Sequence, residues 1–284
     1  MKVIRLAVRA RAEDGERVLA ALLDLAPSGV EQVDGNGWVE FALYGAPGEL
    51  PSLPAGSAEV AGARVSVRGE SVPDDWDERW KRFHAPVLVG GRLYVRPPWE
   101  QAAVRPGVHE IVIDPGQAFG TGTHPTTRMS LELMLELRSR GSLVDLGCGS
   151  GVLAIAAAKL GFGPVIALDS DRAAIAATER NARDNAVMLD RVERFDLRGR
   201  APPRADVVVA NLMLPLLLRL AELLDAQPRA LIASGLLDRE ADEVAAAFAP
   251  LVERHRLVSH GWSSLLLAAP SSQGAAAHRP DPEG

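Results

Sequence analysis

Cysteine is almost absent from this sequence, since Cys148 is its one representative among 284 residues. A single thiol forms no disulfide within the chain, which favours a reducing, cytoplasmic setting. Long hydrophobic runs are missing too. The most apolar stretch, residues 212–224, is interrupted by Pro215, Arg219 and Glu222 and is shorter than the roughly 20 residues that cross a bilayer. We therefore expect no membrane segment.

Positive charge is also scarce. The 31 lysines and arginines are outnumbered by 37 aspartates and glutamates, which gives a formal net charge of −6. Proteins that hold nucleic acid through bulk charge are normally basic. We therefore expect no direct nucleic-acid binding. The length is sufficient for two domains.

Residues 1–70 predict a small α+β domain. Alternating side chains indicate strands, and apolar residues at helical spacing predict a helix over residues 12–25. The loop Asp34-Gly35-Asn36-Gly37 is typical of a hairpin. Prolines in the stretch 45–56 oppose a helix there, so we expect no full second helix. The predicted strands are residues 3–9, 30–33, 38–43 and 60–67.

Residues 71–86 are expected to form a linker helix that begins at Pro73. Trp76, Trp80 and Phe83 share one face of it, and we interpret them as packing residues rather than as a platform for a ligand. At the other end of the chain, residues 270–284 lack periodicity and are rich in Ser, Ala, Pro and Gly. This composition predicts a disordered tail.

Residues 87–269 are expected to form a larger α/β domain. After a hairpin at residues 88–96, strands alternate with helices, which demands a doubly wound, Rossmann-like parallel sheet. The predicted strands are residues 111–113, 143–146, 165–169, 207–211 and 230–234. The predicted helices are residues 126–137, 151–160, 172–185, 215–224 and 239–248.

A glycine-rich turn joins the second of these strands to its helix. Gly147, Gly149 and Gly151 lie at alternate positions, where glycine lets the backbone approach a ligand beside a helix N-terminus. A dinucleotide fingerprint spaces its glycines differently. Asp145 at the strand end would repel a pyrophosphate, but it suits the ammonium of S-adenosylmethionine. The alternative is a purely structural turn.

Two more polar residues end neighbouring strands. Asp169 follows the first glycine by about 20 residues, which suits a contact with ribose hydroxyls; its alternative role is a helix cap, for which Asp171 is the better candidate. Asn211 is our candidate catalytic residue, because its carbonyl can accept an N–H from a substrate amine while its NH₂ donates to the cofactor. Capping of the following turn is an equally weighted interpretation.

The loop over residues 114–127 is dense in Gly, Thr and Pro, which suits close approach to a ligand. Phe119 is positioned to cover the cofactor. His124 is a candidate acid–base group, although a histidine that bonds only backbone is the commoner case. Methyl transfer needs alignment and a deprotonated amine rather than a dedicated base, so we nominate none. We find no zinc spacing, and we interpret Cys148 as a small packing residue.

Together these motifs resemble the PrmA family of bacterial ribosomal protein methyltransferases. The resemblance rests on residues 114–127 and 144–151, on Asp169 and on the strand 207–211, and it covers about residues 73–262. The run Gly-Thr-Gly-Thr-His-Pro-Thr-Thr is its most specific part.

The resemblance implies a function and a layout. It implies an enzyme that uses S-adenosylmethionine to methylate lysine ε-amines and the N-terminal α-amine of the stalk-base protein numbered eleven in the large ribosomal subunit. It also implies a ferredoxin-like N-terminal domain that grips the substrate. Carried over by position, cofactor contacts come from Thr127, Gly147, Asp169 and Asn211, with Phe119 and His124 in the same loop.

Three other functions stay open at this point. The chain can be a class I methyltransferase acting on another protein or a small molecule, a catalytically idle cofactor-binding module, or a nicotinamide dehydrogenase. Asn211 is followed by Leu212-Met213-Leu214 rather than by Pro-Pro-aromatic, which disfavours the related glutamine and adenine N-methyltransferases.

Overall fold

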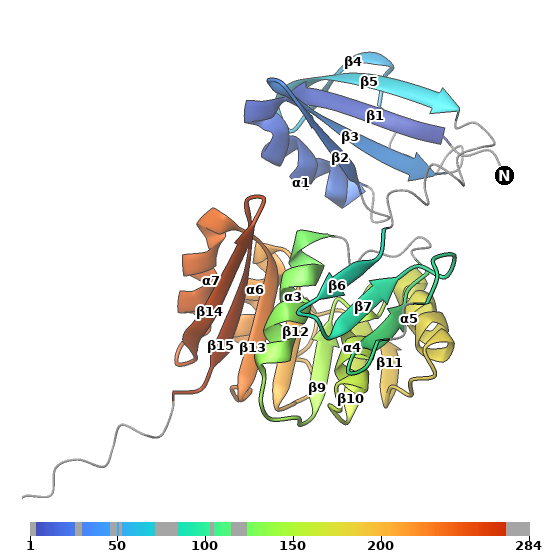
Figure 1. The fold of residues 1–284 in the computed structure, drawn as a ribbon. Coiled ribbons are helices and arrows are strands. Elements are labelled where there is room, and N and C mark those ends of the chain that lie inside the picture. Colours follow the sequence, from blue (N-terminus) through green and yellow to red (C-terminus); the bar gives the residue numbers. More distant parts are fainter. Residues whose placement is uncertain are drawn as a thin grey trace, which may run out of the picture. The chain divides into compact units, whose positions relative to one another are not determined.

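The computed structural model describes residues 4–25, 30–45, 50, 53–71, 85–102, 105–114 and 124–270 (Figure 1). The chain divides into two compact units, with the boundary between Ala85 and Pro86. Each unit has its own hydrophobic core. No helix within the described ranges is long and apolar enough to span a membrane. The linker helix and the tail expected from the sequence lie outside these ranges.

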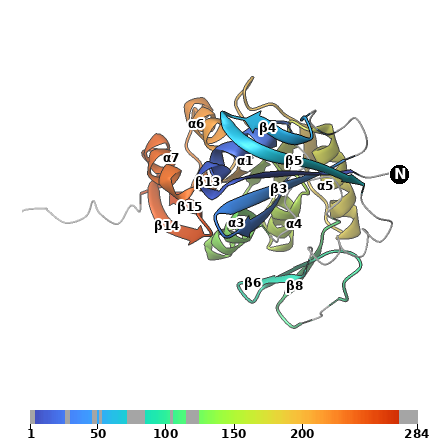
Figure 2. The same ribbon diagram turned by 90° about the horizontal axis from the view of Figure 1, so that it is seen from above.

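The first unit is a five-stranded antiparallel sheet with the strand order β2-β3-β1-β5-β4. Figure 2 looks down on this sheet. Its elements are β1 (Ile4–Arg11), η1 (Ala12–Asp14), α1 (Gly15–Leu25), β2 (Glu31–Gly35), β3 (Trp38–Gly45), β4 (Gly56–Val60) and β5 (Ala63–Ser71).

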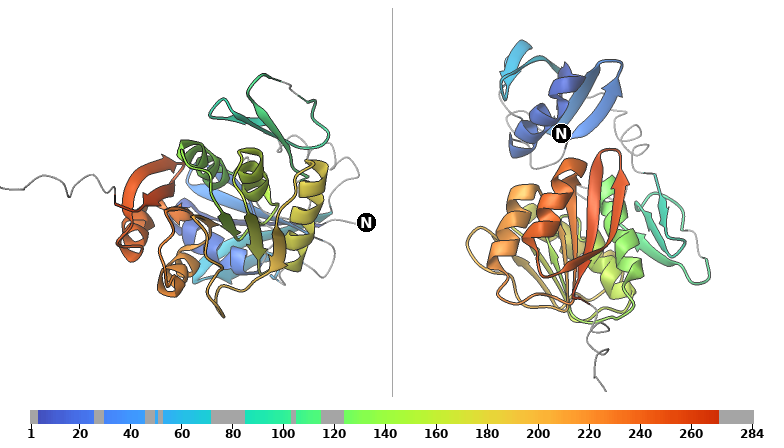
Figure 3. Two further views of the ribbon diagram at one scale, coloured as in Figure 1. Left: turned by 90° about the horizontal axis from the view of Figure 1, so that it is seen from below. Right: turned by 90° about the vertical axis from the view of Figure 1, so that its left-hand side faces the viewer.

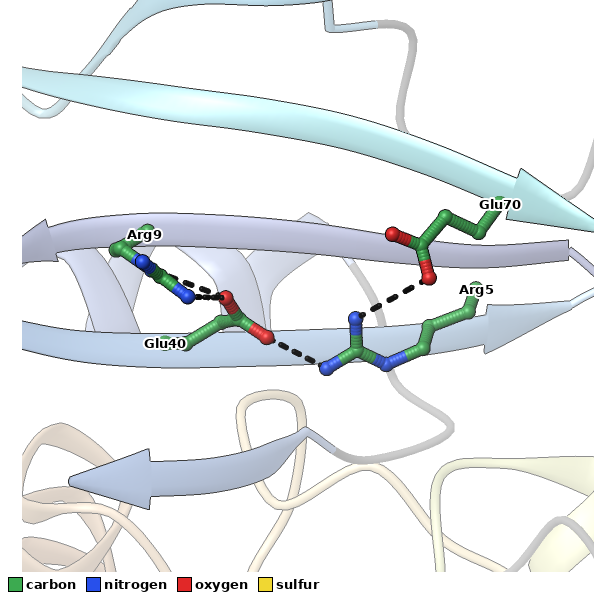
Figure 4. Close-up of polar contacts among 4 residues, drawn as sticks. All are labelled: Arg5, Arg9, Glu40 and Glu70. Carbon is green, nitrogen blue, oxygen red and sulfur yellow. Dashed lines mark hydrogen bonds and ion pairs between the residues drawn. The ribbon is translucent and has the colours of Figure 1, made fainter. Parts of the chain in front are cut away.

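Alternation along β1 separates the two faces of this sheet. Leu6 and Val8 are buried with Val18 and Leu22 of α1, which covers one face. The opposite face carries ion pairs (Figure 4). There the Glu40 carboxylate accepts hydrogen bonds from the guanidinium groups of Arg5 and Arg9, at 2.6 and 2.8 Å. Arg5 also lies 4.0 Å from Glu70.

Two features of this unit bear on the sequence predictions. Strand order β2-β3-β1-β5, with α1 after β1, is that of a ferredoxin-like sheet, as expected. The prediction of one strand over residues 60–67 is wrong, because positive φ angles at Ala61 and Gly62 turn the chain back. Two paired strands, β4 and β5, result.

The second unit contains a seven-stranded sheet with the order β11-β10-β9-β12-β13-β15-β14. Its strands are β9 (Leu143–Leu146), β10 (Val165–Asp169), β11 (Arg191–Arg194), β12 (Val207–Asn211), β13 (Ala230–Leu237), β14 (Val252–Ser259) and β15 (Trp262–Ala268). Its helices are α3 (Pro125–Glu136), α4 (Val152–Lys159), α5 (Arg172–Asp184), α6 (Leu214–Leu223), η2 (Asp238–Glu240) and α7 (Ala241–Ala247).

Helices cover both faces of this sheet, as a doubly wound fold requires (Figure 3). Along β12, Val207 and Val209 join one core with residues of α3 and α4, while Val208 and Ala210 join the other with residues of α6 and α7. Burial on both faces explains why the central strands are apolar throughout. The carboxyl ends of the parallel strands are thereby the edge at which a ligand site is expected.

The sequence interpretation is wrong in two respects here. The sheet is not wholly parallel, because β15 pairs antiparallel with both β13 and β14. A hairpin turn at His260 and Gly261 joins β14 to β15. Strand β8 (His109–Val112), predicted as the first strand of the alternation, belongs instead to a separate sheet with β6 (Val87–Val89) and β7 (Leu93–Arg96). Those two strands form the hairpin expected around Gly90-Gly91.

Candidate active site

The glycine turn has the backbone that its sequence predicts. Gly147, Gly149 and Gly151 have φ angles of +76°, +52° and +83°, a region that L side chains rarely adopt. At Gly151 there is also no room, since a Cβ would lie 2.8 Å from the side chain of Thr178. These glycines carry the chain from β9 directly into the N-terminus of α4.

Asp145 lies beneath this turn and is fully buried. One carboxylate oxygen, Oδ2, accepts the backbone N–H of Ala154 at 3.1 Å. The other, Oδ1, has no hydrogen-bond partner among the described residues. Burial, together with the negative charge of Asp169, raises the pKa of Asp145 to about 7. The site therefore holds an acid that lacks the positive partner a buried carboxylate normally has.

Asp169 reaches the same turn from the end of β10. Its Oδ2 accepts the N–H of Gly149 at 3.0 Å, and its Oδ1 accepts the N–H of Asp171 at 2.9 Å. Asp171 caps α5 by accepting the N–H of Ala173, which confirms its predicted role. Asp169 thus orders the turn and stays partly exposed.

Two asparagines of α5, which the sequence did not reveal, tie the turn to β8 and to Asp114 two residues beyond it. Asn185 exchanges two hydrogen bonds with the backbone of Val112, at 2.6 and 2.8 Å. Asn181 accepts the N–H of Asp114 at 3.0 Å and donates to the carbonyl of Ser150 at 2.8 Å. The sequence feature that could have revealed them is the spacing of the two asparagines, four residues apart on one face of a predicted helix.

The start of α3 meets the end of β12. The His124 ring nitrogen Nδ1 caps α3 by accepting the N–H of Thr126 and lies 2.7 Å from the Thr126 hydroxyl. That hydroxyl accepts the Asn211 side-chain NH₂ at 3.3 Å. Burial lowers the pKa of His124 to about 4, so its ring is neutral near pH 7. This geometry favours a role for His124 as a cap of the α3 backbone over a role as an acid–base group.

Thr127, the neighbour of Thr126, is fully buried, and its Oγ1 has no hydrogen-bond partner within the described part of the chain. Phe119 lies outside the described residues. Cys148 is buried, and burial raises the pKa of its thiol well above the ordinary value, so it is a neutral packing residue. No group of three or more potential metal-binding side chains gathers among the residues described.

Gly235 of β13 faces Asn211 and was also missed. Its φ is +82°, and a Cβ there would lie 2.7 Å from the Leu212 carbonyl oxygen and 3.0 Å from Asn211 Oδ1. Two acceptor oxygens therefore come together at a spot that only glycine leaves open. A single glycine within an apolar strand offered no periodic signal by which to find it.

The geometry of the site distinguishes between a dinucleotide-binding protein and a methyltransferase. A pyrophosphate would be repelled by a buried carboxylate under the turn, whereas a cationic, ribose-containing ligand matches two acids on adjacent strands. The doubly wound sheet with this turn defines a class I methyltransferase domain.

Comparisons with known proteins agree and are more specific. The family model described as ribosomal protein L11 methyltransferase (PrmA) matches residues 55–269. The chain belongs to this family.

Individual relatives carry the same description. The ribosomal protein L11 methyltransferase of Pectobacterium atrosepticum is 41% identical over 228 residues, which are 75% of this chain and 77% of that protein. That of Heliobacterium modesticaldum is 39% identical over 203 residues, or 68% of this chain; the match spans 63% of the relative, less than two thirds of its length. A crystal structure of the L11 methylase from Lactobacillus delbrueckii subsp. bulgaricus superposes with a TM-score of 0.59 and 26% identity, over 66% of this chain and 98% of that one.

Proposed function

We propose that this chain is an S-adenosylmethionine-dependent protein N-methyltransferase whose substrate is ribosomal protein L11. The observation that carries the proposal is the family match, over a domain whose turn, acids and terminal amide are all in place. The acceptors are lysine ε-amines and the N-terminal α-amine, as the family resemblance implies. An enzyme of this kind works in the cytoplasm, where ribosomal proteins are made.

The residues present fit this cofactor. Asp145 Oδ1 and Thr127 Oγ1 are buried polar atoms without partners among the described residues, and such atoms each destabilise a fold by about 1–3 kcal/mol. A ligand with an ammonium and a carboxylate can satisfy both. The position of Asp145 at the end of β9, directly before the glycine turn, supports a bound amino-acid moiety rather than a defect of packing.

Each part of the cofactor has residues suited to it. Asp145 stabilises the ammonium by charge, and the positive-φ turn of Gly147, Gly149 and Gly151 admits the chain of the ligand close to the backbone. Asp169 retains lone pairs for the ribose hydroxyls, since a carboxylate accepts about four hydrogen bonds and only two are used. Thr127, Phe119 and His124 complete the cofactor-binding set that we propose.

When bound, S-adenosylmethionine would supply a methyl group on a sulfonium; a neutral amine would attack the methyl carbon in line, the carbon–sulfur bond would break, and S-adenosylhomocysteine would leave. The protein aligns that amine. Asn211 Oδ1 accepts one N–H of the substrate nitrogen and directs its lone pair toward the methyl group. We assign no side chain of the described site as a base, because Nδ1 of His124 already accepts the backbone N–H of Thr126. Desolvation of the lysine favours its neutral form before attack.

The first unit, residues 1–70, is proposed to recognise the substrate protein, with residues 71–86 as the linker. It has an independent core, and one face of its sheet carries Arg5, Arg9 and Glu40. Removal of residues 1–85 should leave cofactor affinity intact and raise the KM for ribosomal protein L11.

The proposal is tested by incubating the purified protein with S-adenosylmethionine that carries a labelled methyl group and with the separated large-subunit ribosomal proteins. We expect label on ribosomal protein L11 alone. Label on another protein or on a small molecule would support a different class I methyltransferase. Tight cofactor binding with no transfer to any acceptor would support an idle module.

A further inference from the structure

The hydroxyl group of Thr126 lies between two functional side chains. Its Oγ1 is 2.7 Å from Nδ1 of His124 and 3.3 Å from Nδ2 of Asn211. Thr126 is 1% exposed, so water does not compete for these contacts. The three side chains form a chain of hydrogen bonds from the first turn of α3 to the end of β12.

The direction of this chain is fixed at the histidine. Nδ1 accepts the backbone N–H of Thr126, which is the cap of α3, and an accepting nitrogen carries no proton. The Thr126 hydroxyl must therefore donate its one proton to Nδ1. Its oxygen is then left as an acceptor only, and it accepts from the Asn211 NH₂.

This direction determines how the Asn211 amide is oriented. With its NH₂ held by Thr126, its Oδ1 is turned to the opposite side, toward the space kept open by Gly235. An amide rotated by half a turn would present two N–H donors to the substrate amine, which needs an acceptor. It would also leave its oxygen facing the Thr126 oxygen, two acceptors with no proton between them.

The surroundings hold Thr126 in this arrangement. Its carbonyl oxygen accepts hydrogen bonds from the hydroxyl groups of Ser130 and Ser234, at 2.8 and 3.1 Å. The ring of Trp262 packs edge-on against His124, with centroids 5.3 Å apart. Burial, which lowers the pKa of His124, keeps the ring in the accepting form.

We propose that Thr126 is a positioning residue, whose hydroxyl, oriented by neutral His124, fixes the Asn211 amide with its oxygen toward the substrate amine. This inference rests on the proposed function and deepens it. Thr126 touches neither the reacting amine nor the methyl group; it acts through Asn211.

The test compares Thr126→Val with Thr126→Ser in the full chain. Valine keeps the shape and removes the hydroxyl, whereas serine keeps the hydroxyl. Methyl transfer to ribosomal protein L11 should show kcat reduced by about tenfold to a hundredfold in the valine variant and largely restored in the serine variant. Affinity for S-adenosylhomocysteine, measured by calorimetry, should be the same in all three proteins, which shows that each is folded.

A second measurement does not depend on turnover. Nitrogen NMR of the wild-type imidazole should show His124 protonated at Nε2 and bare at Nδ1 at neutral pH, with the Nδ1 signal shifted in Thr126→Val alone. Failure of the wild type to methylate any ribosomal protein would overturn the proposed function. Active wild-type enzyme with unchanged kcat in the valine variant, equal losses in both variants, or a proton on Nδ1 would each overturn the role of Thr126.

Discussion

At the scale of single residues, Gly235 occupies a position with no room for a side chain. Alanine there would place a methyl group 2.7 Å from the Leu212 carbonyl oxygen and 3.0 Å from Asn211 Oδ1. We expect Gly235→Ala to abolish methyl transfer, because the added methyl group would displace Asn211 Oδ1, which we propose accepts from the substrate amine.

Gly261 provides the matched control for this variant. Its φ of +79° is nearly that of Gly235, but nothing lies within 4 Å of its Cβ position. Gly261→Ala should show the backbone strain alone, a loss of about 1 kcal/mol in the free energy of unfolding, with full activity. Equal activity in the two variants would contradict the assignment of this spot to the substrate.

Asp145 makes stability depend on pH. Its pKa is raised from 3.8 to about 7, so between these values the folded protein binds a proton that the unfolded chain releases. The free energy of unfolding of the cofactor-free protein should therefore fall as the pH rises through this window, by an amount on the order of 4 kcal/mol, and level off above it. Urea unfolding across the pH range measures it.

Asp145→Asn is the comparison for this dependence. Asparagine keeps an oxygen for the Ala154 N–H and does not titrate. The variant should be the more stable protein at pH values above about 7 and bind S-adenosylhomocysteine weakly. Parallel pH curves for the two proteins would show that Asp145 is not the titrating group.

A site residue can be predicted from the sequence when it lies at a fixed spacing from a recognisable strand or helix. Gly147, Gly149 and Gly151 were predictable because they follow an apolar strand at fixed spacing, and their positive φ angles agree. The hydroxyl of Thr126 was not, since its role depends on contact with Asn211, 85 residues away. Long-range contacts of this kind leave no mark in local spacing.

At the scale of elements, α5 connects the glycine turn with Asp114, two residues after strand β8. The link passes through Asn181, which bonds the Asp114 N–H and the Ser150 carbonyl. Asn181→Ala leaves both backbone groups without that partner, and we expect the free energy of unfolding to fall by about 3 kcal/mol. Cofactor affinity should fall as well, because the turn loses its support.

Arg180→Ala is the control, since Arg180 is exposed on the same helix. Its free energy of unfolding should change by less than about 0.5 kcal/mol. Equal stability and equal affinity for S-adenosylhomocysteine in the two variants would contradict this role of Asn181.

The bounds of strands were predicted correctly where the apolar pattern of the sequence was strong. Prediction failed where the pairing of one strand with another decides. Strands β9, β10 and β12 have the predicted bounds, because each is an apolar run between turn residues. Strands β14 and β15 were not predicted. β14 is largely exposed and is defined by its pairing with β15 rather than by its own pattern. Likewise, nothing local to β8 reveals that it pairs with β7 outside the main sheet.

At the scale of the whole molecule, the chain combines an α+β unit with a class I methyltransferase unit. The division into two units was predictable from length and from the change of pattern along the chain. The sheet of the second unit brings the ends of β9, β10 and β12, far apart in sequence, to one edge, and the proposed chemistry depends on this convergence.

The most direct test of the account is calorimetric titration of the cofactor-free full chain with S-adenosylhomocysteine and, separately, with a nicotinamide dinucleotide. We expect saturable binding of S-adenosylhomocysteine at one site per chain, strongly weakened by Asp169→Ala, and no binding of the dinucleotide. A folded protein that binds the dinucleotide, or that shows no affinity for S-adenosylhomocysteine, would contradict this expectation.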